Sequence, residues 1–189
     1  MVFGKIEIEI ESVKPLLMNN PIGYITSDKK VKRTMAKYDT QVEAEKATYR
    51  DSEGYLCIQN NALFGTLING SSFKKVGKFS AKKVLMGNID IEPENVRLLD
   101  KEGDGLKDYE VDVRMVVIQR DRVLKARPLI RNWRATFSII YNMDYAPVIV
   151  SAIQESLIDA GQRAGLLDYR PRFGTFKIIR FEDKGEIKT

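Results

Sequence analysis

The chain has 189 residues, the length of one ordinary domain, and is long enough to bury a substantial hydrophobic core. Histidine is absent and Cys57 is the only cysteine, which excludes imidazole-based catalytic triads, Cys/His zinc sites and disulfides within the chain. The 31 basic residues exceed the 26 acidic ones, for a net charge of +5, and 43% of the residues are hydrophobic, so we expect a folded, mildly basic protein. No apolar run has the length of a membrane helix or the pattern of a signal peptide. We therefore expect a cytoplasmic protein that does not associate with membranes.

The basic residues are concentrated in four segments of the chain. Residues 29–37 and 70–87 contain lysine and arginine but no acid, whereas residues 114–134 and 160–180 contain one aspartate each. Together the segments hold 22 basic and 2 acidic residues, and the rest of the chain holds 9 basic and 24 acidic residues. If the segments converge in space, they form a positive groove on an acidic body, as in proteins that bind a phosphate backbone. The alternative is four separate solvated faces.

Hydrophobic periodicity predicts the elements of the N-terminal half. Isoleucine and glutamate alternate over residues 5–13, which is the period of a half-buried strand. A helix over residues 62–68 is expected to begin at an Asn60 or Asn61 cap and to end at Gly70. The other predicted elements here are a long loop over residues 15–34, a short polar helix over 36–49 and strands at 88–91 and 96–99.

The C-terminal half is predicted to contain a hairpin, a further strand, a helix and a closing strand. The hairpin joins residues 109–118 to 122–130, and residues 134–141 alternate as a third neighbouring strand. An apolar stripe at helical spacing predicts a helix from an Asp144 cap, with Pro147 in its first turn, to Gly161, and residues 175–181 follow as the last strand.

This order of elements matches an α+β fold of the ferredoxin-like type. Its βαββαβ core is an antiparallel sheet with two helices on one face, and RNA-recognition domains are one use of it. We expect a single domain over residues 1–189, with insertions at about 14–55 and 70–108.

A glycine- and arginine-rich loop follows the predicted C-terminal helix. Backbone amides beside Arg170 and Arg172 could hold a phosphate, and Tyr169 and Phe173 are spaced to interleave with these arginines and stack on bases. In the alternative interpretation a glycine ends the helix, Pro171 prevents its continuation and the aromatic rings lie in the core.

The loop resembles the glycine-rich loop of the RAMP superfamily, the repeat-associated proteins of CRISPR effector complexes. In that family the loop joins the last helix to the last strand of a ferredoxin-like fold. A second match covers residues 58–68, where the family often reads Ile-Pro-x-Ser-Ser-Leu-Lys-Gly-x-Leu-Arg. The apolar and glycine positions of this motif agree, but its proline, serines, lysine and arginine are replaced. The residues that carry the two matches are Gly161, Gly165, Arg170, Arg172 and Gly174 in the loop, and Ile58, Leu63, Gly65 and Leu67 in the second motif.

The resemblance implies a compact RNA-binding backbone subunit. The hairpin around Gln119 to Arg134 would then correspond to the family's protruding thumb. Relatives that cleave RNA often use a histidine, which is absent here, or an aspartate on the loop after the first strand. Asp28 lies in that region and is the catalytic candidate.

Two carboxylate stripes, at residues 7–11 and 108–112, offer a possible Mg²⁺ site. The regular spacing favours instead a solvated strand face that pairs with lysine and arginine across the sheet, so we expect no metal and no cofactor. Trp133 and Tyr141 are interpreted as packing residues rather than as a platform for bases.

We therefore expect a non-catalytic protein that binds single-stranded nucleic acid, with a guide RNA favoured over single-stranded DNA. Copies of the chain would assemble side by side along the strand as the backbone of a CRISPR-like ribonucleoprotein, with other effector subunits as further partners. The alternatives are a metal-independent endoribonuclease of the same superfamily and a phage-type protein that binds single-stranded DNA or is structural. The predicted nucleic-acid-binding residues are Lys29, Lys30, Lys32, Arg33, Lys74, Lys75, Lys78, Lys82, Arg120, Arg122, Arg127, Arg163, Gly165, Tyr169, Arg170, Arg172 and Gly174.

Overall fold

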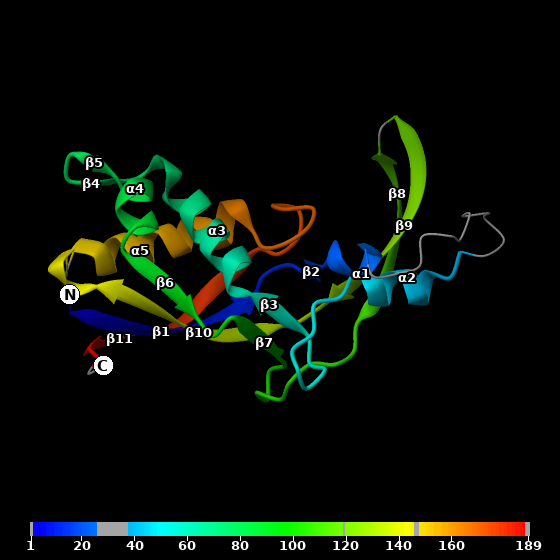
Figure 1. Cartoon of the computed structure of the whole chain (residues 1–189), viewed down its shortest axis with the longest axis horizontal. Coiled ribbons are helices and arrows are strands. Elements are labelled where there is room, and N and C mark those ends of the chain that lie inside the picture. The colour runs from blue at the N-terminus through cyan, green and yellow to red at the C-terminus, as the bar shows by residue number, and fades with distance from the viewer. Residues whose placement is uncertain (1, 26–37, 119, 146–147, 188–189) are drawn as a thin grey trace.

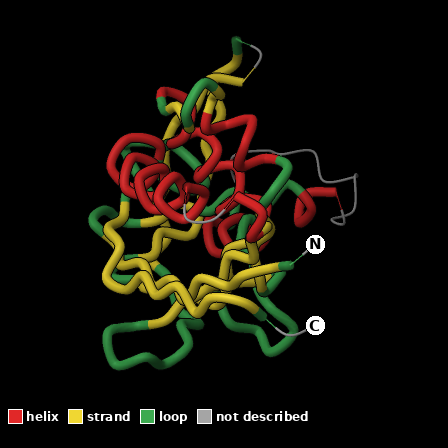
Figure 2. Tube along the Cα trace, turned by 90° about the vertical axis from the view of Figure 1, so that its left-hand side faces the viewer, coloured by secondary structure: helices red, strands yellow, loops and turns green. Residues whose placement is uncertain are grey.

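The computed structural model describes residues 2–25, 38–118, 120–145 and 148–187. They form an α+β structure in which helices cover one face of a large antiparallel sheet (Figure 1, Figure 2), so the predicted α+β class is confirmed. The helices are α1 (Ile22–Ile25), α2 (Thr40–Lys46), α3 (Asn60–Gly70), α4 (Ala81–Met86) and α5 (Val148–Asp159). The strands are β1 (Phe3–Ser12), β2 (Leu16–Leu17), β3 (Cys57–Gln59), β4 (Lys75–Val76), β5 (Phe79–Ser80), β6 (Ile89–Glu92), β7 (Asn95–Leu99), β8 (Glu110–Ile118), β9 (Asp121–Ile130), β10 (Arg134–Asn142) and β11 (Phe176–Glu186).

The main sheet is built around β1 and β10. Its strand order is β11-β1-β10-β7-β3, and β6 also pairs with β10. The ladder between β1 and β10 is antiparallel and runs from the pair Phe3–Asn142 to the pair Glu11–Arg134. Alternation places the three isoleucines of β1 under the helices, where all three are fully buried. The strand predicted over residues 5–13 is therefore confirmed.

The helices α3 and α5 pack against each other above this sheet. A Cβ atom on Gly70, the last residue of α3, would lie 2.2 Å from the backbone oxygen of Ser156 in α5. Glycine is needed at this position because it allows the two helix backbones to come this close. Trp133 and Tyr141 are fully buried in the core beneath the helices, which confirms their interpretation as packing residues.

The strands β8 and β9 form a separate sheet with β2 and project as a long hairpin beyond one end of the main sheet (Figure 1). The predicted hairpin is confirmed, but the prediction that residues 134–141 form its third strand is wrong. Strand β10 lies in the main sheet instead, because the chain turns at Asn132, with a φ of 50°, and Trp133 enters the core.

Some predicted boundaries also differ from the structure. The residue before α3 is Gln59, without a side-chain capping bond, while Asn60 is already helical and donates from Nδ2 to the Ile91 oxygen over 2.9 Å. Asp144 belongs to a 3₁₀ turn, Met143–Tyr145, before α5. The predicted loop 15–34 contains the short elements β2 and α1 in its described part. Pro147 lies outside the described residues.

Candidate nucleic-acid interface

The glycine-rich loop between α5 and β11 is closed at its neck by two glycines. Gly165 and Gly174 have φ angles of 71° and 72°, and the amide of Leu166 donates to the Gly174 oxygen over 2.9 Å. A Cβ atom on Gly174 would lie 2.1 Å from the Leu166 oxygen. Because both glycines are buried, they shape the loop and do not present amides to a ligand. The structure thus gives these two predicted contact residues a structural role, because both amides are bonded within the protein.

Contacts with distant parts of the chain fix the position of this loop. Gly174 donates its amide to the Pro15 oxygen over 2.8 Å, and Asp168 donates its amide to the Leu17 oxygen over 3.0 Å. On the other side, Thr66 of α3 donates its hydroxyl to the Gly165 oxygen over 3.2 Å. The loop is thus held between α3 and the strand that borders the hairpin.

The base of the hairpin packs against the loop through arginines and aromatic rings. The guanidinium carbon of Arg114 lies 4.8 Å from the ring centre of Phe173, and that of Arg127 lies 4.7 Å from the ring centre of Tyr169. The two rings meet edge to face with centroids 6.4 Å apart. Tyr169 and Phe173 therefore interleave with arginines of the hairpin, and not with Arg170 and Arg172 as the sequence suggested.

Arg127 is a structural residue of this contact. It is 3% exposed, and its Nη1 lies 2.8 Å from Oδ2 of Asp168, so its charge is paired inside the protein. Because this guanidinium is buried and paired, it is not available to a phosphate in this structure, and Arg127 is not used as a contact in the proposal below.

Four exposed arginines on the loop and the hairpin have no acidic partner among the described residues. Arg170 and Arg172 lie at the tip of the loop, next to Tyr169, which is 38% exposed. Arg120 and Arg122 lie at the turn of the hairpin, where Arg120 has a φ of 75°. Within the described ranges, none of these four arginines makes an ion pair.

The second basic segment, residues 70–87, is rich in lysine and lies away from the loop and the hairpin. The elements β4, β5 and α4 are at the opposite end of the molecule from the hairpin (Figure 1). Lys74 is paired with Glu155 and Asp159 at 3.3 and 3.2 Å, whereas Lys75, Lys78 and Lys82 are exposed. Arg163 is also exposed, and its Nε lies 3.9 Å from Oδ1 of Asp159.

The second basic segment lies away from the third and fourth (Figure 1), so the four segments do not form one common groove. Among the described residues, the structure brings together parts of the third and fourth segments, which belong to the hairpin and the loop. Lys29, Lys30, Lys32 and Arg33, with the catalytic candidate Asp28, lie outside the described residues.

A cavity of about 470 Å³ lies between α3 and the loop. Sequence reasoning missed it because its walls come from four separate parts of the chain. Two of these parts belong to the matched motifs, but only folding brings all four together. The residues that line it include Asn19, Tyr49, Asn61, Phe64, Asp168 and Arg170. Of these, only Arg170 was predicted as a site residue. The cavity thus combines aromatic rings, amides, one carboxylate and one guanidinium.

The face of the sheet away from the helices carries ion pairs. Glu11 lies 2.8 Å from Nη2 of Arg134 and 2.7 Å from Nζ of Lys177, and these two cations lower the pKa of Glu11 to about 2. Arg180 lies beside Glu7 and Glu9 at 3.8 and 3.6 Å. The interpretation of this stripe as a paired, solvated face is therefore confirmed. Among the residues that the structure describes, no group of three or more acidic or cysteine side chains is arranged to hold a metal.

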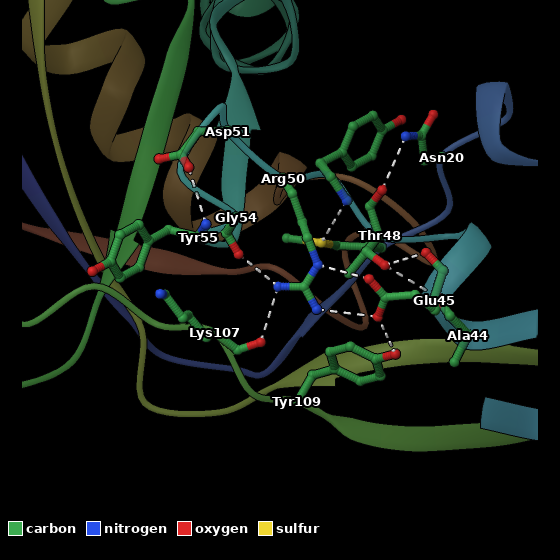
Figure 3. A network of polar contacts seen from close by, with 12 residues as sticks. Asn20, Ala44, Glu45, Thr48, Arg50, Asp51, Gly54, Tyr55, Lys107 and Tyr109 are labelled. Atoms are coloured by element: carbon green, nitrogen blue, oxygen red, sulfur yellow. Dashed lines mark hydrogen bonds and ion pairs between the residues drawn. The ribbon is translucent and has the colours of Figure 1, made fainter. Parts of the chain in front are cut away.

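A polar network braces the base of the hairpin (Figure 3). The guanidinium of Arg50 donates to Glu45 over 2.7 Å and to the backbone oxygens of Gly54 and Lys107 over 2.8 and 3.1 Å. Tyr109 donates its hydroxyl to Glu45 over 2.7 Å, and burial together with this bond raises the pKa of Tyr109. The segment that contains α2 is thereby fixed to the chain that enters β8, and it holds the hairpin in place.

Comparison with models of known protein families and with curated proteins finds no match. In the described part of the chain, no helix has the length and hydrophobicity needed to span a membrane. The function is therefore inferred from the geometry and charges given above.

Proposed function

We propose that the protein binds single-stranded nucleic acid, RNA in preference to DNA, across the loop and the hairpin, without cleaving it. One observation carries this proposal: among the described arginines, only Arg120, Arg122, Arg170 and Arg172 lack an ion pair, and all four lie on two neighbouring projections. Uncompensated guanidinium groups suit phosphate oxygens, because their planar fork forms two parallel hydrogen bonds.

The arrangement of the strands supports a ferredoxin-like core of the RAMP type. The order β11-β1-β10-β7 places the last strand of a βαββαβ unit beside its first strand, and the neighbours are antiparallel. Both α3 and α5 lie on one face of the sheet (Figure 1), as that core requires. The projecting β8–β9 hairpin is then the thumb, and copies of the chain assemble side by side along the strand as a backbone subunit.

The charges favour the helix side of the molecule as the binding face. RNA-recognition domains stack bases on aromatic residues of the exposed sheet face. Here that face carries Glu7, Glu9 and Glu11 with their basic partners, and the glutamates would repel a phosphate backbone. The nucleic acid therefore lies across the loop and the hairpin.

Replacement of Arg170 and Arg172 by alanine tests this assignment. We expect the double variant to bind a roughly 30-nucleotide single-stranded RNA about tenfold or more weakly. The slope of log affinity against log salt should fall by about 1.4, because each lost phosphate contact contributes about 0.7 for a single strand. Fluorescence anisotropy at several salt concentrations measures both quantities.

The matched control is Lys83→Ala with Lys101→Ala, which removes two exposed charges that are not among the predicted contact residues. Equal losses in the two double variants would show that only net charge matters and would refute the loop assignment. RNA cleavage in the presence of EDTA would favour the endoribonuclease, and stronger binding of matched DNA would favour the phage-type protein.

A further inference from the structure

We infer that the cavity between α3 and the glycine-rich loop binds one nucleobase of the strand and selects guanine. This inference rests on the proposed function, because the base must belong to a bound strand. The cavity has a volume of about 470 Å³ and is lined by the aromatic residues Tyr49 and Phe64. Pockets for unstacked bases combine apolar or aromatic walls with polar groups that bind the edge of the base.

The lining of the cavity favours a base over a phosphate. Its two aromatic residues offer stacking surfaces, and its one acidic residue, Asp168, is already paired with the buried Arg127. Asn19 and Asn61 in the same lining carry amides, which offer donors and acceptors to the polar atoms of a base.

Asp168 is the group that distinguishes between bases. An ionised carboxylate only accepts hydrogen bonds, and guanine has two adjacent donors, N1–H and the N2 amino group, on its Watson–Crick edge. On the same edge adenine and cytosine place an acceptor nitrogen beside the amino group, and uracil places carbonyl oxygens beside its single N–H. Each of these three bases would turn at least one acceptor toward the carboxylate.

The position of Asp168 is fixed before a ligand binds. Its Oδ2 accepts from the buried Arg127 over 2.8 Å, and its amide donates to the Leu17 oxygen over 3.0 Å. Asp168, a residue of the cavity lining, thus has one carboxylate oxygen bound to Arg127 and the other without a hydrogen bond among the described residues. Because Asp168 is already held in place, little side-chain entropy is lost when a base binds, and a base with the wrong donors meets a fixed acceptor.

The test uses short oligouridine strands that carry one guanosine, adenosine, cytidine or inosine at the centre, with fluorescence anisotropy as the readout. We expect the guanosine strand to bind at least about fivefold more tightly than the others, the range of a good two-bond base contact. Inosine lacks the N2 amino group, so the inosine strand should bind much more weakly than the guanosine strand. This comparison uses the wild-type protein.

A protein variant provides the second arm. Asp168→Asn should abolish the guanosine preference, measured as the ratio of the affinities for the guanosine and all-uridine strands in the same variant, since an amide offers only one acceptor oxygen. Asp159→Asn, which alters a paired carboxylate on α5, should keep the preference. If Asp168→Asn fails to fold, the inosine comparison decides.

The possible outcomes separate the two proposals. Equal affinity for all strands would overturn the guanine pocket and leave nucleic-acid binding intact. If no strand binds at all, both the proposed function and this inference fail. If the inosine strand binds as tightly as the guanosine strand, the N2 amino group is not recognised and the carboxylate is not the selecting group.

Discussion

Two glycines show how single residues determine the candidate interface. Gly174 and Gly185 have almost the same φ angle, 72° and 70°, but different surroundings. A Cβ atom on Gly174 would lie 2.1 Å from the Leu166 oxygen, whereas a Cβ atom on Gly185 would meet nothing within 4 Å. The first glycine is required by backbone packing at the neck of the loop. The second is required only by its φ angle.

Gly174→Ala should therefore destabilise the protein much more than Gly185→Ala. Backbone strain alone costs about 1–2 kcal/mol at a left-handed position, which is the loss expected for Gly185→Ala. The steric clash at Gly174 should raise the loss to at least about 3 kcal/mol. Urea denaturation followed by circular dichroism measures both free energies of unfolding. Equal losses would show that the backbone at the neck of the loop moves to accommodate the methyl group with no further loss of stability.

At the scale of elements, ion pairs across neighbouring strands stabilise the exposed face of the main sheet. Glu11 of β1 lies between Arg134 of β10 and Lys177 of β11, so one carboxylate joins three strands. The bonds to Lys177 and Arg134 lower the pKa of Glu11 from 4.5 to about 2. A carboxyl group whose pKa is lower in the folded state stabilises that state while it is ionised.

The stability difference between the wild type and Glu11→Gln should accordingly depend on pH. It is present in full above about pH 4.5, the pKa of an unperturbed glutamate, and is lost as the pH falls towards about 2, the folded-state value. Urea denaturation at a series of pH values measures it. Glu92→Gln, which removes an exposed carboxylate of β6, is the control variant. A difference that stays constant down to pH 2 would contradict the role of Glu11.

The whole molecule has two basic ends with different properties. At one end the hairpin and the loop carry arginines, and at the other end β4, β5 and α4 carry lysines (Figure 1). The two ends can meet different parts of a long strand or different partners, but they cannot form a single groove. Most other cations in the described part of the chain are neutralised by neighbouring carboxylates.

Hydrogen–deuterium exchange should locate the nucleic acid on the molecule. We expect a short single-stranded RNA to slow exchange in residues 165–174 and at the turn between β8 and β9, and to leave α4 unchanged. A strand too short to reach from one end to the other makes the comparison decisive. Protection of α4 without protection of the loop would place the binding face at the lysine-rich end.

The sequence by itself determined the local elements of this protein. The alternation over residues 5–13, the hairpin and the C-terminal helix are visible because each depends on neighbouring residues. The arginine-rich hairpin and the glycine-rich loop were recognised for the same reason. The cap of α3 and the partner of β10 were predicted wrongly, since each depends on contacts with distant strands.

Only the tertiary structure decided which charged and polar residues are available to a ligand. Arg127 and Asp168 are 41 positions apart, and Arg134 and Glu11 are 123 apart, yet both pairs are in contact. Such pairing makes a cation unavailable to a ligand. The residues next to it in the sequence do not indicate that it is paired. The cavity beside α3 arose in the same way, because folding collects its rings, amides and carboxylate from segments that are separate in the sequence.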